Sequence, residues 1–283
     1  MTLESLLGPS PPQMAYSWCG HAAAGPLPGL VIDAGIVALA ALYAAVALGG
    51  SRRPRRGQVA AFAAGLMLMA GVMSGPLERL ALDRLFTAYI AQQIALVMLV
   101  APLLLLGTPD WMLRPLLANR FVAPLWRRIT HPFLTVLIFA AFFASIHFPA
   151  ICNRVCHVHQ FYYGIRLMLL VVGVLLWWPI LSPLPEFPRL SYPVQILYLF
   201  SLTIPMVAIS APITFSRSIL YTFYAEGAHP WGIPPLEDQA LGGLLMWVGD
   251  GFYILSVITV IFFRWMAHEA SDGPLASATQ SQV

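Results

Sequence analysis

The stretch TAYIAQQIALVMLVAPLLLL, residues 87–106, decides the fold class of this chain. It contains no charged side chain, and an α-helix of this length rises by about 30 Å, the thickness of the hydrocarbon core of a bilayer. A helix satisfies its own backbone hydrogen bonds in lipid, which an isolated strand does not. We therefore expect residues 87–106 to form a transmembrane helix.

Composition extends this expectation to the whole chain. Of its 283 residues, 59% are hydrophobic and 10% are charged, whereas soluble domains carry about 25% charged residues. The sequence predicts an all-α fold, a polytopic membrane helix bundle with seven transmembrane helices. The other six apolar segments are residues 28–49, 58–75, 132–148, 160–181, 192–213 and 239–263.

Composition also excludes several functional classes. The net charge is only +3 and no glycine-rich phosphate loop is present, so no nucleic-acid partner is expected. Three cysteines are too few for a disulfide framework. No Ser-His-Asp set, zinc motif or carboxylate pair stands out, so we do not expect an enzyme. The N-terminus lacks a basic region before an apolar core, and no cleavable signal peptide is expected.

Arginine placement predicts the orientation, because cytoplasmic loops of membrane proteins are enriched in basic residues. Ten of the 15 arginines lie on one side, mostly in the connections at 51–56 and 109–131. That side is expected to be cytoplasmic in a bacterial inner (plasma) membrane, with an interfacial helix at 111–126. We expect an extracytoplasmic tail over 1–27, the seven-helix domain over 28–265 and a cytoplasmic tail over 266–283.

The segment CNRVCHVHQ, residues 152–160, concentrates metal-capable side chains on the expected outer side. In a helix the i, i+4 spacing of Cys152 and Cys156 places both sulfurs on one face, where soft thiolates favour Cu(I). His157 and His159 are further candidate ligands; their i, i+2 spacing separates them on a helix but not on a strand. The alternatives are a local disulfide, two separate thiols, or a pairing of either cysteine with Cys19, the third cysteine of the chain.

Four other polar residues are candidates for supporting roles. His147 ends the fourth span as a metal ligand or as a hydrogen-bonded structural residue. Asp238 and Gln239 open the seventh span, where an acid complements the helix dipole and caps the helix. Arg166 lies inside the fifth span and needs a partner, because an intramembrane charge is expensive. Asp238 or Glu237 is the first expected partner, and Asp250 the second.

The C-terminal third carries a recognisable pattern. PLEDQALGGLLMW resembles the P-L-x-D-Q-x-x-x-G-x-x-M-W signature of the CtaG-like (caa-type) cytochrome c oxidase assembly factor family. That resemblance implies a seven-span membrane protein that helps to build copper-containing haem oxidases. It extends over roughly residues 28–265, on the segments VAPLLLLGTP (100–109), IHFPAI (146–151), GVLLWWP (173–179), LYTFY (220–224) and PLEDQALGGLLMW (235–247).

The chain departs from that family at four intramembrane histidines. The family has H-M-x-x-H entering the third span and H-x-x-x-H in the fifth. Here these positions hold Tyr89, Gln93, Tyr162 and Arg166, and none of these side chains is a soft ligand for Cu(I). The resemblance thus implies either that the metal is lost or that its site has moved outward to residues 152–159.

Three functional hypotheses follow. The first is an oxidase assembly factor that aids copper insertion, or scaffolds a haem-copper oxidase subunit, at the outer face of the membrane. The second is a copper transport or tolerance protein of CopD-like type, and the third a metal-free membrane interaction protein. Expected partners are the oxidase subunit, a copper chaperone and the lipid bilayer. The hypothetical copper ligands are Cys152, Cys156, His157, His159 and His147, supported by Asp238, Gln239 and Arg166.

Overall fold

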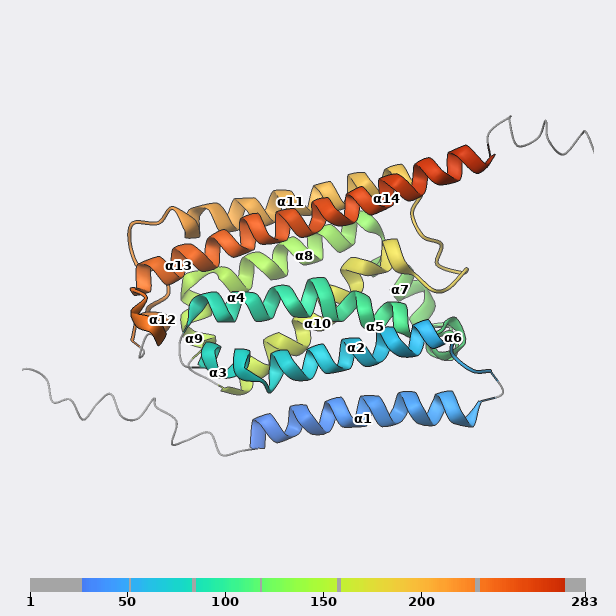
Figure 1. The fold of residues 1–283 in the computed structure, drawn as a ribbon, viewed down its shortest axis with the longest axis horizontal. Helices are drawn as coiled ribbons and strands as arrows, with labels where there is room; N and C mark the ends of the chain where they lie inside the picture. Colours follow the sequence, from blue (N-terminus) through green and yellow to red (C-terminus); the bar gives the residue numbers. More distant parts are fainter. Residues whose placement is uncertain are drawn as a thin grey trace, which may run out of the picture.

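The computed structural model describes residues 27–50, 52–82, 85–117, 119–156, 159–226 and 230–272. Every regular element in these ranges is helical, as the sequence predicts. The long helices lie roughly side by side and run back and forth between two ends of a bundle (Figure 1). The expected tail at 1–27 lies almost entirely outside the described ranges, as does most of the tail at 266–283.

Six of the seven predicted spans are confirmed as helices long and apolar enough to cross a bilayer. The fourth is shorter, because α8 has 16 residues (Pro132–His147) and reaches spanning length only together with α7 (Val122–Ile129), across a 73° bend. The spans are α1 (Leu27–Gly49), α2 (Arg56–Met73), α4 (Phe86–Ile94) continued by α5 (Ala101–Gly107), α8, α10 (His159–Leu181), α11 (Tyr192–Thr214) and α13 (Pro235–Leu244) continued by α14 (Asp250–Asp272).

Short helices distinguish the two ends of the bundle (Figure 1). At the end where α1 finishes lie α6 (Asp110–Leu117) and α7, and we call this the arginine-rich end. At the opposite end lie α3 (Pro76–Leu82), α9 (Pro149–Cys156), α12 (Thr222–Ala225) and the 3₁₀ turn Pro230–Gly232.

Two predicted boundaries are wrong. The single interfacial helix expected at 111–126 is two helices, α6 and α7, separated by a turn at 119–121. The last span is expected to end at 263, but its helix continues as α14 to Asp272. Its apolar run ends near the predicted position, and the helix then continues as a polar extension beyond the bundle (Figure 1).

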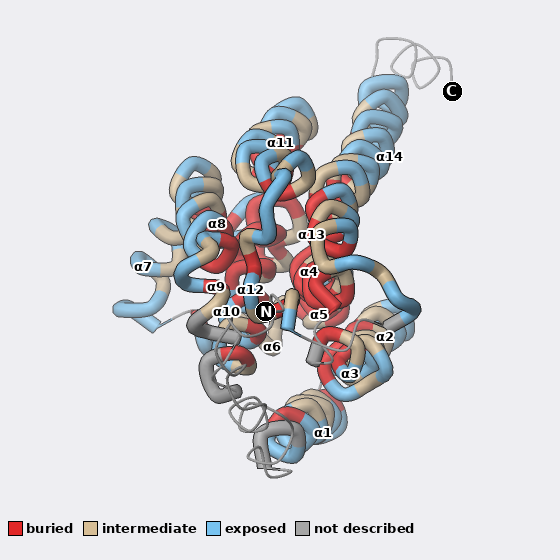
Figure 2. Tube along the Cα trace, turned by 90° about the vertical axis from the view of Figure 1, so that its left-hand side faces the viewer, coloured by how far each residue is buried: buried red, intermediate tan, exposed pale blue. Residues whose placement is uncertain are grey.

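The core lies between α4–α5, α10, α11 and α13–α14, whereas α1 lies at the margin (Figure 2). In the apolar window of α1, 6% of residues are buried, against 67% for the span Phe86–Gly107. Apolar side chains such as Leu30, Val31 and Phe263 remain exposed on the outside of the bundle. In a membrane this surface faces lipid tails, which a soluble protein could not tolerate.

Candidate functional site

Asp238 caps a helix, but not its own. Its side chain lies in the first turn of α13 and accepts hydrogen bonds from the backbone N–H groups of Phe86, at 2.5 Å, and Thr87, at 3.0 Å. The Thr87 hydroxyl donates back to the Asp238 carbonyl at 3.0 Å. The expected capping chemistry is therefore present, but it satisfies the N-terminal donors of α4, the neighbouring span.

Gln239 fastens the connection that precedes α13. Its Oε1 accepts from the backbone N–H of Leu220 at 2.7 Å, and its Nε2 donates to the carbonyl of Ser218 at 3.2 Å. Gln239 is 2% exposed and Asp238 is 1% exposed. The Asp-Gln pair thus joins the start of the seventh span to α4 on one side and to the 215–221 connection on the other.

The glycines that follow this pair allow the helices to approach closely. A methyl group on Gly242 would lie 2.5 Å from Cδ1 of Phe86, and one on Gly243 would lie 2.5 Å from Oγ1 of Thr214. Such distances are far below van der Waals contact, so only glycine fits at either position. The D-Q-x-x-G-G part of the sequence is therefore a device for packing α13 against α4 and α11.

We expect Gly242→Ala to lower the free energy of unfolding by about 1–3 kcal/mol, because the buried Phe86 ring, stacked on Tyr221, has no room to withdraw. The matched control is Gly251→Ala in the continuation of the same span, where no heavy atom lies within 4 Å of the added methyl group. Alanine is the better helix former, so that variant should be neutral or slightly stabilising. Unfolding titrations in mixed micelles measure both changes, and equal effects would contradict this role of Gly242.

A buried polar group occupies the end of the bundle opposite the arginine-rich end. We call Glu78, Gln92, Tyr162 and Arg166 the Arg166 cluster. The Arg166 guanidinium donates to Oε1 of Gln92 and to the Tyr162 hydroxyl. Nε2 of Gln92 donates to Oε2 of Glu78 at 2.5 Å and to the Val72 carbonyl at 2.7 Å. Gln92 therefore bridges a buried cation and a buried carboxylate through its two ends.

Aromatic rings complete the surroundings of this cation. The guanidinium carbon of Arg166 lies 4.2 Å from the ring centroid of Tyr162 and 5.6 Å from that of Tyr89, both within cation–π range. Arg166 is 1% exposed and Glu78 is 5% exposed. Helices α4 and α10, together with the short α3, thus enclose two groups of opposite charge, the Arg166 guanidinium and the Glu78 carboxylate.

Three of the four positions at which the family resemblance implies histidines meet here. Tyr89, Tyr162 and Arg166 are neighbours, whereas Gln93 lies one helical turn further along α4. Phenol and guanidinium groups do not bind Cu(I), and the guanidinium already supplies a positive charge at this place. The residues present therefore do not fit a copper ion at this intramembrane position.

The expected pairing of Arg166 with Asp238 is wrong, because each has other partners. Arg166 lies in the cluster with Glu78, whereas Asp238 binds the first two backbone donors of α4. Asp250, the second expected partner, lies deeper, beside a small internal cavity. Sequence reasoning missed Glu78 and Gln92, because neither stands in a motif that links it to the fifth span.

That cavity, of about 20 Å³, lies at mid-bundle and has room for one water molecule. Gln93 and Asp250 line it. Within the described structure, three of their polar atoms have no hydrogen-bond partner: Oε1 and Nε2 of Gln93 and Oδ1 of Asp250. Two π-helical turns, Ala95–Val100 and Leu245–Gly249, adjoin these two residues. Such turns displace the helix register locally and often accompany functional sites.

His147 presents a buried nitrogen at the end of α8. Its Nδ1 is 2.8 Å from the carbonyl oxygen of Phe143, so Nδ1 carries the proton and donates it. Nε2 then keeps its lone pair, is buried, and has no hydrogen-bond partner among the described residues. The Tyr221 hydroxyl donates to the His147 backbone carbonyl at 2.8 Å. His147, one of the expected copper ligands, thus has a fixed tautomer and an Nε2 lone pair that no described residue uses.

Cys152 is buried on α9, a short helix that also contains the backbone of Cys156. The backbone of both cysteines is therefore helical, which is the condition under which i, i+4 side chains share one face. The side chains of Cys156 and His159, and the whole of His157, lie outside the part of the structure that is described. Among the side chains that are described, no three His, Cys, Asp or Glu groups gather around one point. The copper set at 152–159 stays a prediction.

Asn153 anchors α9 to the next connection. Its Nδ2 donates to the carbonyl of Leu220 at 3.2 Å, and its Oδ1 accepts from the N–H of Phe223 at 3.4 Å. Leu220 is also the residue held by Gln239. The amide side chains of Asn153 and Gln239 thus link α9, α12 and the start of α13 through hydrogen bonds to the backbone between them.

Comparisons with known proteins show which family model and which relatives this chain resembles. A family model described as cytochrome c oxidase caa3 assembly factor matches residues 40–268. Uncharacterised proteins of Mycobacterium bovis and Mycobacterium tuberculosis are each 28% identical over 198 residues, covering 64% of this chain and 30% of their own length. One of Mycobacterium leprae is 24% identical over 139 residues, 48% of this chain and 21% of its own. The chain spans less than a third of these relatives, and no solved structure matches it.

Proposed function

The chain belongs to the cytochrome c oxidase caa3 assembly factor family, and from this we propose that it assists the assembly of a haem-copper oxidase in a bacterial inner membrane. The family is not a catalytic class, and the proposal requires no turnover. The partner is an oxidase subunit that the bundle holds while its metal centres are built. Six to seven apolar helices support a multi-pass membrane protein.

The observation that carries the mechanism is the Arg166 cluster. A guanidinium hydrogen-bonded to Gln92 and Tyr162 stands among the residues that replace the family histidines. Because a fixed cation repels another cation at this depth, the bundle itself holds no copper there. We propose that the membrane domain acts as a rigid scaffold and that any copper is cargo handled at the end that carries α9.

Copper insertion at that end is the second part of the proposal. Cys152, Cys156, His157 and His159 would bind Cu(I), a soft cation, and His147 would contribute through its open Nε2 lone pair. A copper chaperone would supply the ion. Asp238 and Gln239 support this surface by fixing α4 and the 215–221 connection.

One experiment separates delivery from scaffolding. The protein is purified in detergent without oxygen and under reducing conditions, given Cu(I), freed of excess ion and analysed for bound copper. Delivery predicts stoichiometric copper that is lost in the Cys152→Ser/Cys156→Ser variant and is unchanged in Cys19→Ser. No copper in either protein would leave scaffolding alone.

The assembly role is tested in cells that lack the protein. We expect reduced haem a absorbance and reduced oxygen consumption from cytochrome c in their membranes, both restored by the wild-type chain. Undiminished oxidase would contradict the proposal. Membrane vesicles that accumulate copper only when the chain is present would instead favour the CopD-like transport alternative.

A further inference from the structure

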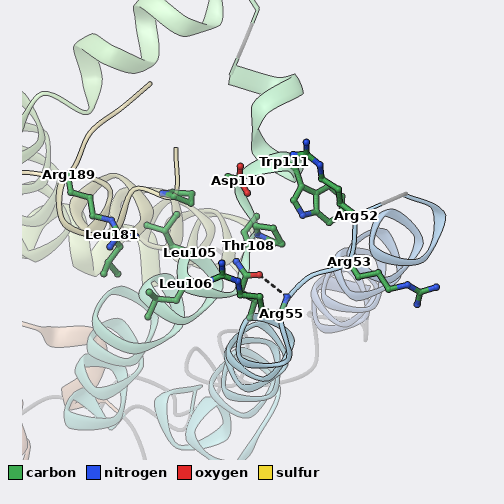
Figure 3. Close-up of a pocket in the computed structure, with 13 residues that line it drawn as sticks. Arg52, Arg53, Arg55, Leu105, Leu106, Thr108, Asp110, Trp111, Leu181 and Arg189 are labelled. Carbon is green, nitrogen blue, oxygen red and sulfur yellow. Dashed lines mark hydrogen bonds between the residues drawn. The ribbon is translucent and has the colours of Figure 1, made fainter. Parts of the chain in front are cut away.

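A polar pocket of about 520 Å³ opens at the arginine-rich end of the bundle (Figure 3). It lies where α2 begins, where α5 ends and where α6 begins, and the connection from α10 to α11 closes its far side. Its volume is within the range of small-molecule sites. The lining residues used below are Arg52, Arg53, Arg55 and Arg189, with Leu105, Leu106, Leu181, Asp110 and Trp111.

The pocket gathers positive charge from two distant parts of the sequence. Arg52, Arg53 and Arg55 come from the first connection and Arg189 comes from the fifth, on opposite sides of the pocket (Figure 3). Among the residues that the structure describes, none of these four side chains is within ion-pair distance of a carboxylate. Loop arginines that only set membrane orientation need not converge in this way.

One acid, Asp110, lines the pocket beside the four arginines. Asp110 lies 3.8 Å from Arg114, which is not a lining residue and lies closer, at 3.2 Å, to Glu186. Nε of Arg189 donates to the Ser182 carbonyl at 2.9 Å, which positions the side chain and leaves its two terminal nitrogens for a ligand. The pocket is therefore a set of guanidinium donors with an uncompensated positive charge.

The lower wall of the pocket is apolar. Leu105, Leu106 and Leu181 line it beside the arginines, and Leu106 is 47% exposed on the surface of a membrane-spanning helix. Trp111 lies next to Arg52 (Figure 3), and indole rings favour the level of lipid headgroups. An amphiphile fits this combination, with an anionic head among the arginines and hydrocarbon against the leucines.

We propose that this pocket binds the phosphate headgroup of an anionic phospholipid. Guanidinium groups bind phosphate oxygens with paired donors, and basic pockets between membrane helices recognise such headgroups. A free phosphate ion would use the arginines but would gain nothing from the leucines. The lipid would also bridge the first connection and the fifth at this end of the bundle.

The test uses the full chain in detergent and native mass spectrometry. The probes are phosphatidylglycerol, zwitterionic phosphatidylcholine and inorganic phosphate as a competitor. We expect retention of phosphatidylglycerol over phosphatidylcholine, weakened about tenfold to thirtyfold in Arg52→Gln/Arg189→Gln, since each arginine near a lipid surface contributes about a factor of five. The control Arg120→Gln/Arg128→Gln removes the same charge at the same end of the bundle, outside the pocket.

The outcomes are distinguishable. Equal weakening in both double variants would show only general surface charge and would overturn the site. Phosphatidylcholine held as tightly as phosphatidylglycerol would exclude headgroup recognition, and full competition by inorganic phosphate would show a soluble-anion site. A second pair, Arg53→Gln/Arg55→Gln, must also weaken binding, and melting curves in detergent show whether each variant is folded. No oxidase takes part, so the result is independent of the proposed function.

Discussion

Arg166→Leu is expected to lower the free energy of unfolding by about 3–5 kcal/mol, because it leaves the Glu78 carboxylate buried without its cation. Gln92 loses its charged donor at the same time, and the Tyr162 hydroxyl loses the same guanidinium. Glu78 and Arg166 are two buried groups of opposite charge linked through Gln92, and removing one costs about this much because the other keeps its full desolvation penalty. Unfolding titrations in mixed micelles measure the change.

The double variant Glu78→Leu/Arg166→Leu gives the sharper result. With both charges gone, the Arg166 cluster no longer holds an uncompensated charge, so the double variant should be more stable than Arg166→Leu alone despite carrying an additional substitution. The matched control is Arg79→Leu, which removes an exposed arginine next to Glu78 in the sequence and should change stability by less than about 0.5 kcal/mol. An Arg166→Leu protein as stable as this control would refute the buried pair.

The same pair shows which part of the structure the sequence predicts and which it does not. Span positions follow from uninterrupted apolar length, a property of each segment by itself, and all seven apolar segments are helical. The partner of Arg166 depends instead on how the third and fifth spans are rotated about their axes and on where the short α3 folds back. Spacing within a segment carries no information on that rotation, and so Glu78 and Gln92 were not found.

The Asp-Gln motif illustrates a related limit. From the sequence, Asp238 is expected to cap the span that it opens. The residue type is right for capping, but the helix is wrong, because α13 has no side-chain cap. The sequence does not reveal that the capped donors belong to α4, about 150 residues earlier, because only the folded structure brings Phe86 and Thr87 against Asp238. A residue type therefore predicts an interaction, whereas only the fold identifies the partner.

The cavity between Gln93 and Asp250 is a third feature that the sequence does not reveal. Asp250 directly follows one π-helical turn, and Gln93 lies two residues before the other. Three methionines also line the cavity, namely Met98, Met206 and Met246. From sequence these methionines are ordinary packing residues. The structure groups them with polar atoms that have no partner among the described residues, which a pattern along one helix does not show.

Asp238→Ala is expected to lower the free energy of unfolding by about 2–4 kcal/mol, since two N-terminal donors of α4, one of them fully buried, lose their acceptor. Asp238→Asn keeps one acceptor oxygen and should lose roughly half as much. Glu237→Ala, one residue earlier and exposed, is the control and should change stability by less than about 0.5 kcal/mol.

Because α4 leads into the Arg166 cluster, Asp238→Ala should also speed hydrogen exchange at Phe86 and Thr87 more than elsewhere in the span. Uniform exchange along α4 would show that Asp238 supports the whole bundle rather than capping this helix.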